Sequence, residues 1–301
     1  MGIRFQDVTR SEVLGHLANS FEHARGRSYM YMDENYNAPW DHKNYFFDLL
    51  CSFPEKERVA LEQQIDLQMA STGIKRIMDQ GCARAKSLRK TTNHFADRFP
   101  YNRFFAYGLS GSLEDMDLGF LKEDDEIDEV EEISLNEFGI HPFDDYSKRD
   151  EEGKVRFFGI ERDLHTAMKD FPFPLDLVIT QNTYYHLSFP WMAFKHTADS
   201  LAVGGVAIVK SMPPFMIYDE QEKPIKIHSF LEYLQEDNLG YELVKSSYQD
   251  SHPLLAVIKR RDSPFRTHLH IGSVDRGEFK SYRTVYSRNL VRDDLIPIDF
   301  F

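Results

Sequence analysis

Hydrophobic positions with helical spacing run through the first part of the chain. Residues 9–25 form an amphipathic pattern, and Thr9 and Glu12 have the spacing of a capping box at its start. The apolar stripe of this segment comprises Val13, Leu14, Leu17 and Phe21. Residues 43–71 continue with helical spacing. The pattern therefore predicts a helical region over residues 1–72.

From residue 73 onward, short apolar runs alternate with helical segments. The strand-like runs are residues 74–80, 103–109, 155–160, 175–180, 206–211, 241–248 and 254–259. The helical segments are residues 84–98, 163–170, 188–202 and 227–239. Alternation through 74–211 predicts a parallel sheet with helices on both faces, because parallel neighbours need crossover connections. The last two strands are separated only by 249–253, and we expect them to pair as an antiparallel hairpin.

The expected fold is α/β, with a doubly wound, mostly parallel seven-stranded sheet. An N-terminal helical cap would span residues 1–72, and the α/β domain would span 73–260 with an acidic insertion at 112–152. A C-terminal extension would span 261–301. We expect this extension to add strands, as its sequence KSYRTVYS indicates, or to pack on the N-terminal helices.

The net charge of −13 is concentrated in one segment. Residues 112–152 carry 17 acidic and 3 basic residues, whereas the other 260 residues have a net charge of +1. This distribution argues against nucleic acid as a partner, although less strongly than a uniformly acidic surface would. Two interpretations of the insertion remain open. It lies against the basic tail at 259–292, or it recruits a basic protein partner.

Several classes of protein are not indicated by the sequence. No apolar run approaches the roughly 18–20 residues that cross a bilayer, and the first residues lack a secretory signal, so a cytoplasmic location is expected. Cys51 and Cys82 give no disulfide framework. His268 and His270 have metal-like spacing but no evident third ligand, and no metal site is expected.

A glycine- and alanine-rich segment, Asp79–Ala85, follows the first predicted strand. In doubly wound sheets, ligands bind beyond the carboxyl ends of the strands, near the switch in strand order. A loop at this place must let a ligand approach its backbone closely, and Gly81, Ala83 and Ala85 supply a small residue at every second position. Taken alone, the pattern equally fits a tight turn without a ligand.

Residues 175–212 read as a buried strand, a loop, a helix, a Gly-Gly turn and a further strand. With Asp79 and Gly81, this order resembles the class I (Rossmann-like) S-adenosylmethionine-dependent methyltransferases over residues 74–260. The matching features are Asp176–Ile179 for the fourth strand, Tyr185–Leu187 for the loop after it, and Val203–Gly205 for the turn before the fifth strand. The resemblance implies S-adenosylmethionine as cofactor and a methyl acceptor as partner.

The resemblance also implies which residues contact the cofactor. They are Asp79, Gly81, Cys82, Ala83, Ser110, Glu161, Asp163, Gln181 and Asn182. Two features depart from the family pattern. Alanine replaces glycine at 83 and 85, which is tolerable only if φ stays negative and the cofactor does not press on Cβ. Ser110 stands where the family has the acid that binds the ribose. Without this acid the affinity for the cofactor should fall by about ten-fold, unless Glu114 or Asp115 substitutes.

Catalytic residues are harder to assign, because methyl transfer is an in-line displacement that needs alignment and desolvation more than an acid or a base. The candidates are Tyr185, in a segment resembling the N-x-x-[YF] signature of amino-methylating enzymes, and His186. The alternative for the segment that holds Tyr185 is a wall between cofactor and substrate, and the alternative for His186 is a structural residue of the loop. The N-terminal helices and residues 28–42 are expected to cover the cofactor. The predicted function is methyl transfer to a small molecule or a protein. The alternative is an inactive methyltransferase-like scaffold that binds a partner through its acidic insertion.

Overall fold

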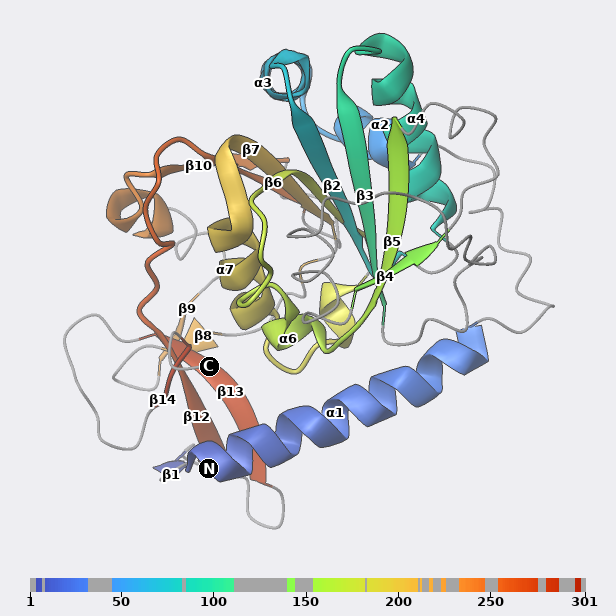
Figure 1. Ribbon diagram of the computed structural model, residues 1–301. Helices are drawn as coiled ribbons and strands as arrows, with labels where there is room; N and C mark the ends of the chain where they lie inside the picture. Colours follow the sequence, from blue (N-terminus) through green and yellow to red (C-terminus); the bar gives the residue numbers. More distant parts are fainter. Residues whose placement is uncertain are drawn as a thin grey trace.

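The computed structural model contains two sheets and a set of helices (Figure 1). It describes residues 4–6, 9–31, 45–82, 85–110, 140–143, 154–181, 183–210, 212, 217–218, 223–225, 233–246, 254–275, 280–286 and 296–298. The acidic insertion lies largely outside these residues, so neither interpretation of the insertion is tested. Among the helices described, none combines the length and the apolar character needed to cross a membrane.

The central sheet has the strand order β10-β11-β7-β6-β2-β3-β5-β4. Its parallel strands are β2 (Ile74–Gln80), β3 (Arg103–Ser110), β5 (Val155–Glu161), β6 (Leu175–Gln181) and β7 (Leu201–Lys210). The antiparallel additions are β4 (Ile140–Phe143) on β5 and β11 (Leu254–Lys259) on β7, with β10 (Tyr241–Lys245) pairing antiparallel with β11.

This topology is the class I methyltransferase fold, and it confirms the expected fold class. Within the central sheet, the chain enters at β2 and continues outward to β3 and β5. It then crosses back to β6, which lies on the other side of β2. The expected antiparallel hairpin is present as β10 and β11, with β11 inserted next to β7. All seven expected strands are found. An eighth strand, β4, comes from the acidic insertion and extends the sheet beyond β5.

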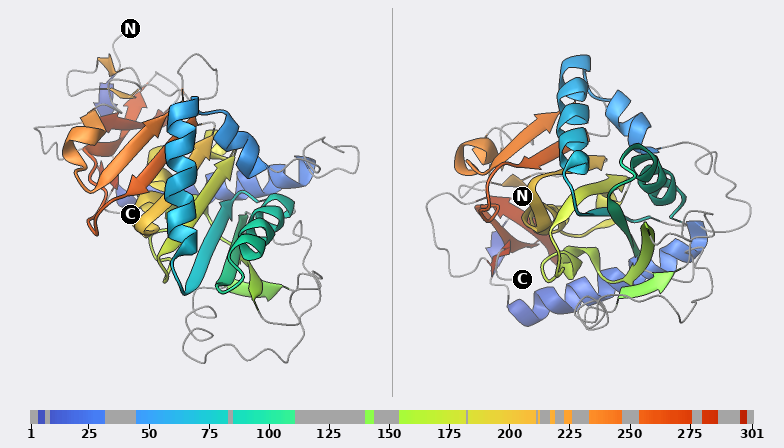
Figure 2. Two further views of the ribbon diagram at one scale, coloured as in Figure 1. Left: turned by 90° about the horizontal axis from the view of Figure 1, so that it is seen from above. Right: turned by 45° about the horizontal axis from the view of Figure 1, so that its top comes forward.

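Helices cover both faces of the central sheet (Figure 2). The helices are α1 (Arg10–Tyr31), α2 (Tyr45–Cys51), α3 (Glu55–Ala70), α4 (Lys86–Arg98), α6 (Leu164–Ala167), the 3-10 turn η3 (Tyr184–His186) and α7 (Pro190–Ser200). Buried residues of α2, α3 and α4 form one hydrophobic cluster with the sheet, and those of α6 and α7 form another. The central strands are apolar on both faces because both are covered.

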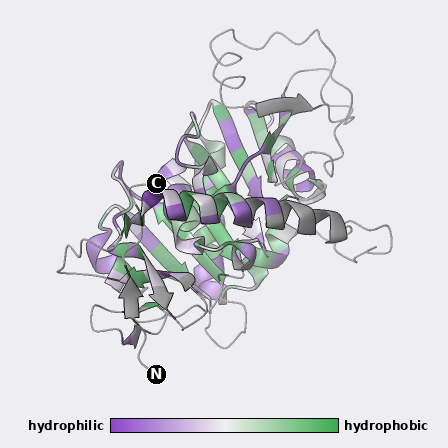
Figure 3. Ribbon diagram, turned by 90° about the horizontal axis from the view of Figure 1, so that it is seen from below, coloured by the Kyte–Doolittle hydropathy of each residue, from purple (hydrophilic) through white to green (hydrophobic). Residues whose placement is uncertain are grey.

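The capping box predicted for α1 is confirmed. The Thr9 amide donates to Glu12 Oε2 at 2.8 Å, and the Glu12 amide donates to Thr9 Oγ1 at 3.3 Å. The predicted apolar stripe is wrong at Leu14, which is 42 % exposed, whereas Val13 and Leu17 are buried. Figure 3 shows α1 crossing one side of the molecule, and Val13 and Leu17 are the positions of the stripe that face the core.

A second sheet joins three distant parts of the chain. Its strands are β1 (Arg4–Gln6), β8 (Ile217–Tyr218), β9 (Pro224–Ile225), β12 (Leu269–Asp275), β13 (Lys280–Tyr286) and β14 (Ile296–Pro297). The strand expected in the tail is β13, and the N-terminal β1 pairs with β12. The division of the chain at residues 72 and 260 stays a prediction.

The amino-terminal edge of the sheet is held by Asp176. Its carboxylate accepts hydrogen bonds from the Arg76 amide and from Gln68 Nε2, both at 2.7 Å, and so ties β6 to β2 and α3. Asp176 is 6 % exposed. The other acidic contact of α3, between Asp66 and Arg98, lies on the surface.

These two contacts predict a contrast in stability. Asp176→Ala leaves two buried donors without their acceptor and should lower the free energy of unfolding by about 2–4 kcal/mol. Asp66→Ala removes an exposed ion pair and should cost less than about 1 kcal/mol. Urea unfolding of both variants measures the difference, and equal losses would contradict the structural role given to Asp176.

Candidate functional site

The loop after β2 lies at the switch point of the sheet, between the ends of β3 and β6. Asp79 pairs in register with Gly108 of β3 and with Ile179 of β6. The Gly81 and Cys82 amides both donate to the Leu109 carbonyl, at 2.7 and 3.3 Å. The start of the loop is therefore fastened to β3 by its own backbone.

Gly81 is required for two reasons. Its φ of +75° lies in the left-handed region that favours glycine. A Cβ at this position would also collide with the Thr183 hydroxyl. The sequence predicted a small residue so that a ligand could approach, but the close neighbour in the structure is the loop after β6.

Ala85 corrects an expectation. An alanine was considered tolerable here only with negative φ, whereas Ala85 has a φ of +57° and forms the N-cap of α4 without a side-chain hydrogen bond. A left-handed conformation costs a residue with Cβ roughly 1–2 kcal/mol. Ala83, the other alanine of the motif, lies outside the described residues.

The Asp79 carboxyl group is 6 % exposed at the end of the central strand. Burial raises the pKa of Asp79 to about 7, and no charged side chain among the described residues offsets this cost. Burial and the neighbouring Asp79 together raise the pKa of Cys82 well above its usual value. The thiol is therefore protonated and unreactive, which favours the reading of Cys82 as a small buried residue.

The ends of β3 and β5 bring a hydroxyl and a carboxylate together. Ser110 and Glu161 are register partners, so their Cα atoms are neighbours across about 4.8 Å and their side chains leave the same face. Ser110 is 8 % exposed and Glu161 is partly exposed. Glu114 and Asp115, the expected substitutes for the ribose acid, lie outside the described residues.

Asp163 is held in structural contacts. It caps α6 by accepting the His165 amide at 3.1 Å, and it contacts His165 Nδ1 at 2.7 Å. The other ring nitrogen, Nε2, accepts the Phe189 amide at 3.1 Å. Nδ1 therefore carries the proton, and His165 links α6 to the segment before α7. The predicted cofactor contact of Asp163 is not tested by this arrangement.

The loop after β6 supplies the candidate acceptor side. Gln181 is partly exposed at the strand end, and His186 is exposed in η3. Asn182 and the Tyr185 side chain lie outside the described residues. The tyrosine that the structure brings into the site is Tyr184, which is completely buried.

The sequence reading missed a buried polar cluster beneath the two loops. Its members are Gln80, Thr180, Tyr184 and Thr197, each 0 % exposed. They come from β2, β6, η3 and α7. The sequence signal is weak, because Gln80 and Thr180 are polar positions at or next to the carboxyl ends of β2 and β6, and their position does not identify their partners.

The N-terminal helix α1 contacts this edge of the sheet. His16 lies 5.8 Å from Phe189, in the segment after η3, and 4.7 Å from Tyr282 of β13, measured between ring centroids. Burial lowers the pKa of His16, and the nearby His165 lowers it further. Of the N-terminal helices that were expected to cover the cofactor, α1 makes this contact, whereas α2 and α3 pack against a face of the sheet and residues 32–42 lie outside the described residues.

Metal ligands do not gather in the part of the chain that the structure describes. No group of three or more histidine, cysteine, aspartate or glutamate side chains there could hold an ion. His268 instead pairs with Asp237 at 3.2 Å.

Comparison with known proteins gives matches to solved structures only. No protein-family model matches the sequence, and no curated protein does. One solved structure, the plantazolicin methyltransferase BpumL, is 11 % identical, with 83 % of this chain and 99 % of that chain aligned at a TM-score of 0.41. An rRNA methylase from Streptococcus thermophilus is 12 % identical, covering 66 % and 95 % at 0.31. A Haloferax volcanii putative methyltransferase, in complex with the Trm112 activator, is 14 % identical, covering 81 % and 97 % at 0.36.

These scores are low, and the fold assignment rests on the strand order and not on the matches. The order, with β11 antiparallel next to β7, is that of the class I methyltransferases. The likeness is one of fold.

The strained Ala85 predicts an unusually small cost for a glycine substitution. Ala85→Gly removes the left-handed penalty of roughly 1–2 kcal/mol, but it adds the backbone entropy of glycine and deletes a completely buried methyl group worth about 0.8 kcal/mol. The free energy of unfolding should therefore change by less than about 1 kcal/mol. The same change at Ala193, an equally buried position inside α7, should lower it by about 2 kcal/mol. Urea unfolding of both variants measures the difference, and equal losses would contradict the observed φ.

The buried Asp79 predicts a pH-dependent cost. Because its folded pKa is raised, the folded state holds a proton that the unfolded state has lost between about pH 4 and 7, so stability falls as pH rises through this window. Asp79→Asn should therefore match wild type near pH 4 and exceed it by up to about 4 kcal/mol at pH 7.5. Urea titrations at both pH values test this, and a difference that does not change with pH would refute it.

Proposed function

We propose that the protein binds S-adenosylmethionine at the carboxyl edge of the central sheet and transfers its methyl group to an acceptor. The observation that carries this proposal is the position of the loop after β2. Its left-handed Gly81 lies at the switch point between β3 and β6, where open α/β sheets bind their ligands.

The charge of the site supports a cationic ligand. Asp79 is a carboxyl group buried at a cost to stability, and such costs concentrate at functional sites. S-adenosylmethionine supplies a sulfonium-activated methyl group, and it carries positive charge on this sulfur and on its amino group. A positive charge beside Asp79 would favour the ionised carboxylate and offset the cost of burying it.

Ser110 and Glu161 together fit the ribose subsite. The family acid is missing from β3, but strand register makes Glu161 of β5 the direct neighbour of Ser110, with its side chain on the same face of the sheet. A carboxylate accepts two hydrogen bonds from neighbouring hydroxyls, and a serine hydroxyl accepts or donates one. We therefore propose that Glu161 and Ser110 bind the ribose diol. Asp163 is not assigned to the ribose, and its role is that of the N-cap of α6.

The acceptor would enter on the side of the loop after β6. His186 and Tyr185 are the candidate catalytic residues, with Gln181, Asn182, Cys82 and Ala83 as further contacts of the cofactor. Because the reaction is an in-line displacement, the main work of these residues would be alignment and exclusion of water. The proposed acceptor is a small molecule or a protein, and the proposed location is the cytoplasm.

One observation favours a second function, that of an inactive scaffold. Thr183 occupies the space over Gly81, and Ala85 replaces a glycine in a left-handed turn. Both features limit how closely a cofactor approaches the loop. In this alternative the acidic insertion at 112–152 binds a basic protein partner, and no cofactor is held.

Isothermal titration with S-adenosylmethionine and S-adenosylhomocysteine separates the two functions. We expect binding of both, and no binding at millimolar ligand would exclude the enzymatic proposal. Asp79→Ala should abolish binding. Glu161→Gln should weaken it by about ten-fold, the effect of removing one charged hydrogen bond.

Glu236→Gln, an exposed change in the helical segment at 233–237, serves as the control and should leave binding unchanged. Unchanged affinity in Asp79→Ala would show that the loop is assigned wrongly. Unchanged affinity in Glu161→Gln would remove only the ribose assignment.

A further inference from the structure

Three side chains beneath the site form a closed ring of hydrogen bonds. Gln80 Nε2 donates to Thr197 Oγ1 at 2.8 Å, and the Tyr184 hydroxyl donates to Gln80 Oε1 at 3.0 Å. Because the single Tyr184 proton is used in that bond, the 2.9 Å contact between Thr197 and Tyr184 must be donated by Thr197. A fourth hydroxyl, from Thr180, also donates to Gln80 Oε1 at 2.7 Å.

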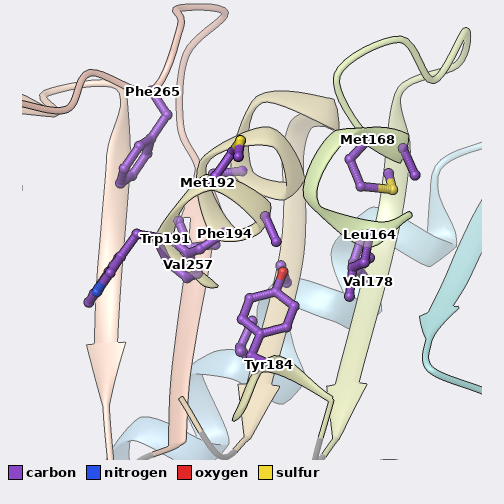
Figure 4. Packing of buried hydrophobic residues seen from close by; sticks show 14 of the residues in the cluster. Leu164, Met168, Val178, Tyr184, Trp191, Met192, Phe194, Val257 and Phe265 are labelled. Carbon is purple, nitrogen blue, oxygen red and sulfur yellow. The ribbon is translucent and has the colours of Figure 1, made fainter. Parts of the chain in front are cut away.

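Every polar atom of this ring is satisfied in a place without solvent. All four residues are 0 % exposed, and Figure 4 shows Tyr184 inside the hydrophobic cluster with its hydroxyl directed toward α7. Burial raises the pKa of Tyr184 far above its usual value, so the hydroxyl keeps the proton that the ring requires. Apolar side chains of the same shape would fill this space at a similar free energy of folding. The role of the hydrogen bonds is therefore to fix the relative positions of the elements that they join.

The ring joins the two loops of the site. Gln80 is the last residue of β2 and directly precedes Gly81, whereas Tyr184 begins η3 in the loop after β6. Thr183 completes the connection, because its hydroxyl lies 3.1 Å from the Gln80 carbonyl and 3.0 Å from the Gln181 carbonyl while its side chain covers Gly81. The two loops are therefore in contact above the ring and bonded through it.

We propose that Tyr184 is a positioning residue. Acting through Gln80 and Thr197, it holds the loop after β6 against the loop after β2, so that the cofactor side and the acceptor side of the site form one preorganised unit. The coupling of the two loops rests on the geometry alone. Its use in methyl transfer rests on the proposed function.

Hydrogen–deuterium exchange tests the coupling without any ligand. The amides of Gly81 and Cys82 are protected by Leu109, and those of His186 and Leu187 by Thr183 and Tyr184. In Tyr184→Phe, both groups of amides should exchange faster together, by roughly ten-fold, the effect expected when one buried hydrogen bond is lost. Acceleration at 184–187 alone, or at neither segment, overturns the proposal.

Tyr241→Phe is the matched control. It also removes a buried hydroxyl, one that donates to the Ser263 carbonyl at 2.6 Å, but it lies on β10 away from both loops. Its exchange at 79–82 and 184–187 should equal that of wild type, and coupled acceleration there as well would contradict a specific role for Tyr184. If Tyr184→Phe does not fold, Thr180→Val removes one donor of the cluster and should accelerate both segments to a smaller extent.

A pH profile separates positioning from general destabilisation. Gln80→Glu reproduces the ring only when the new carboxyl group is protonated, because only then does it donate to Thr197 while accepting from Tyr184. At each pH we compare the affinities of the folded variant and of wild type for S-adenosylhomocysteine. The two affinities should be nearly equal at pH 5, and that of the variant should be about ten-fold weaker at pH 8. A ratio that stays constant with pH overturns the positioning role. If wild type does not bind, the proposed function fails, and the exchange experiment still decides the coupling.

Discussion

The end of β2 places a carboxyl group and an amide side chain in a space without water, directly before a left-handed turn at the exposed Gly81, and the arrangement of the two loops depends on how the buried groups are paired. The Gln80 side chain is hydrogen-bonded to three hydroxyl groups, and these bonds fix the positions of the surrounding loops. Gly81 supplies the turn, and the Leu109 carbonyl accepts the amides that follow it. Asp79 is the exception, because its carboxyl group is buried without a compensating charge among the described residues. The same strand end thus combines an amide that is hydrogen-bonded to three hydroxyls with a carboxyl group whose burial no charge offsets.

The site keeps the plan of the class I fold while changing several of its contacts. Glycine is retained only where backbone conformation and the neighbouring Thr183 both demand it, and Ala85 accepts strain at the N-cap of α4. The acid that the family has at the end of β3 is absent here. Glu161 of β5 is the direct neighbour of that position, because parallel pairing in register places it beside Ser110. These departures lie in the loops and at strand ends, and the sheet and its helices do not depend on them.

The two ends of the chain come together around the carboxyl edge of the sheet. β1 pairs with β12, and β8, from the segment after β7, pairs with β13. His16 of α1 then contacts both β13 and the segment after η3. The N-terminal segment and the C-terminal strands therefore form one structure, in which β1 is placed by backbone pairing with β12 and α1 by side-chain packing on β13.

The sequence by itself determined the order of the elements, because alternating apolar runs and amphipathic helices leave few ways to bury both faces of a parallel sheet. It also located the loop after β2, since small residues follow the first strand. The tertiary structure decided what the loop contacts. Two of its features join residues about 100 positions apart, namely the approach of Thr183 to Gly81 and the ring through Tyr184. A third, the left-handed φ of Ala85, depends on backbone geometry. Such contacts follow from strand register and not from spacing along the chain. For this reason sequence patterns favoured Tyr185, whereas the fold buries Tyr184 beneath the two loops.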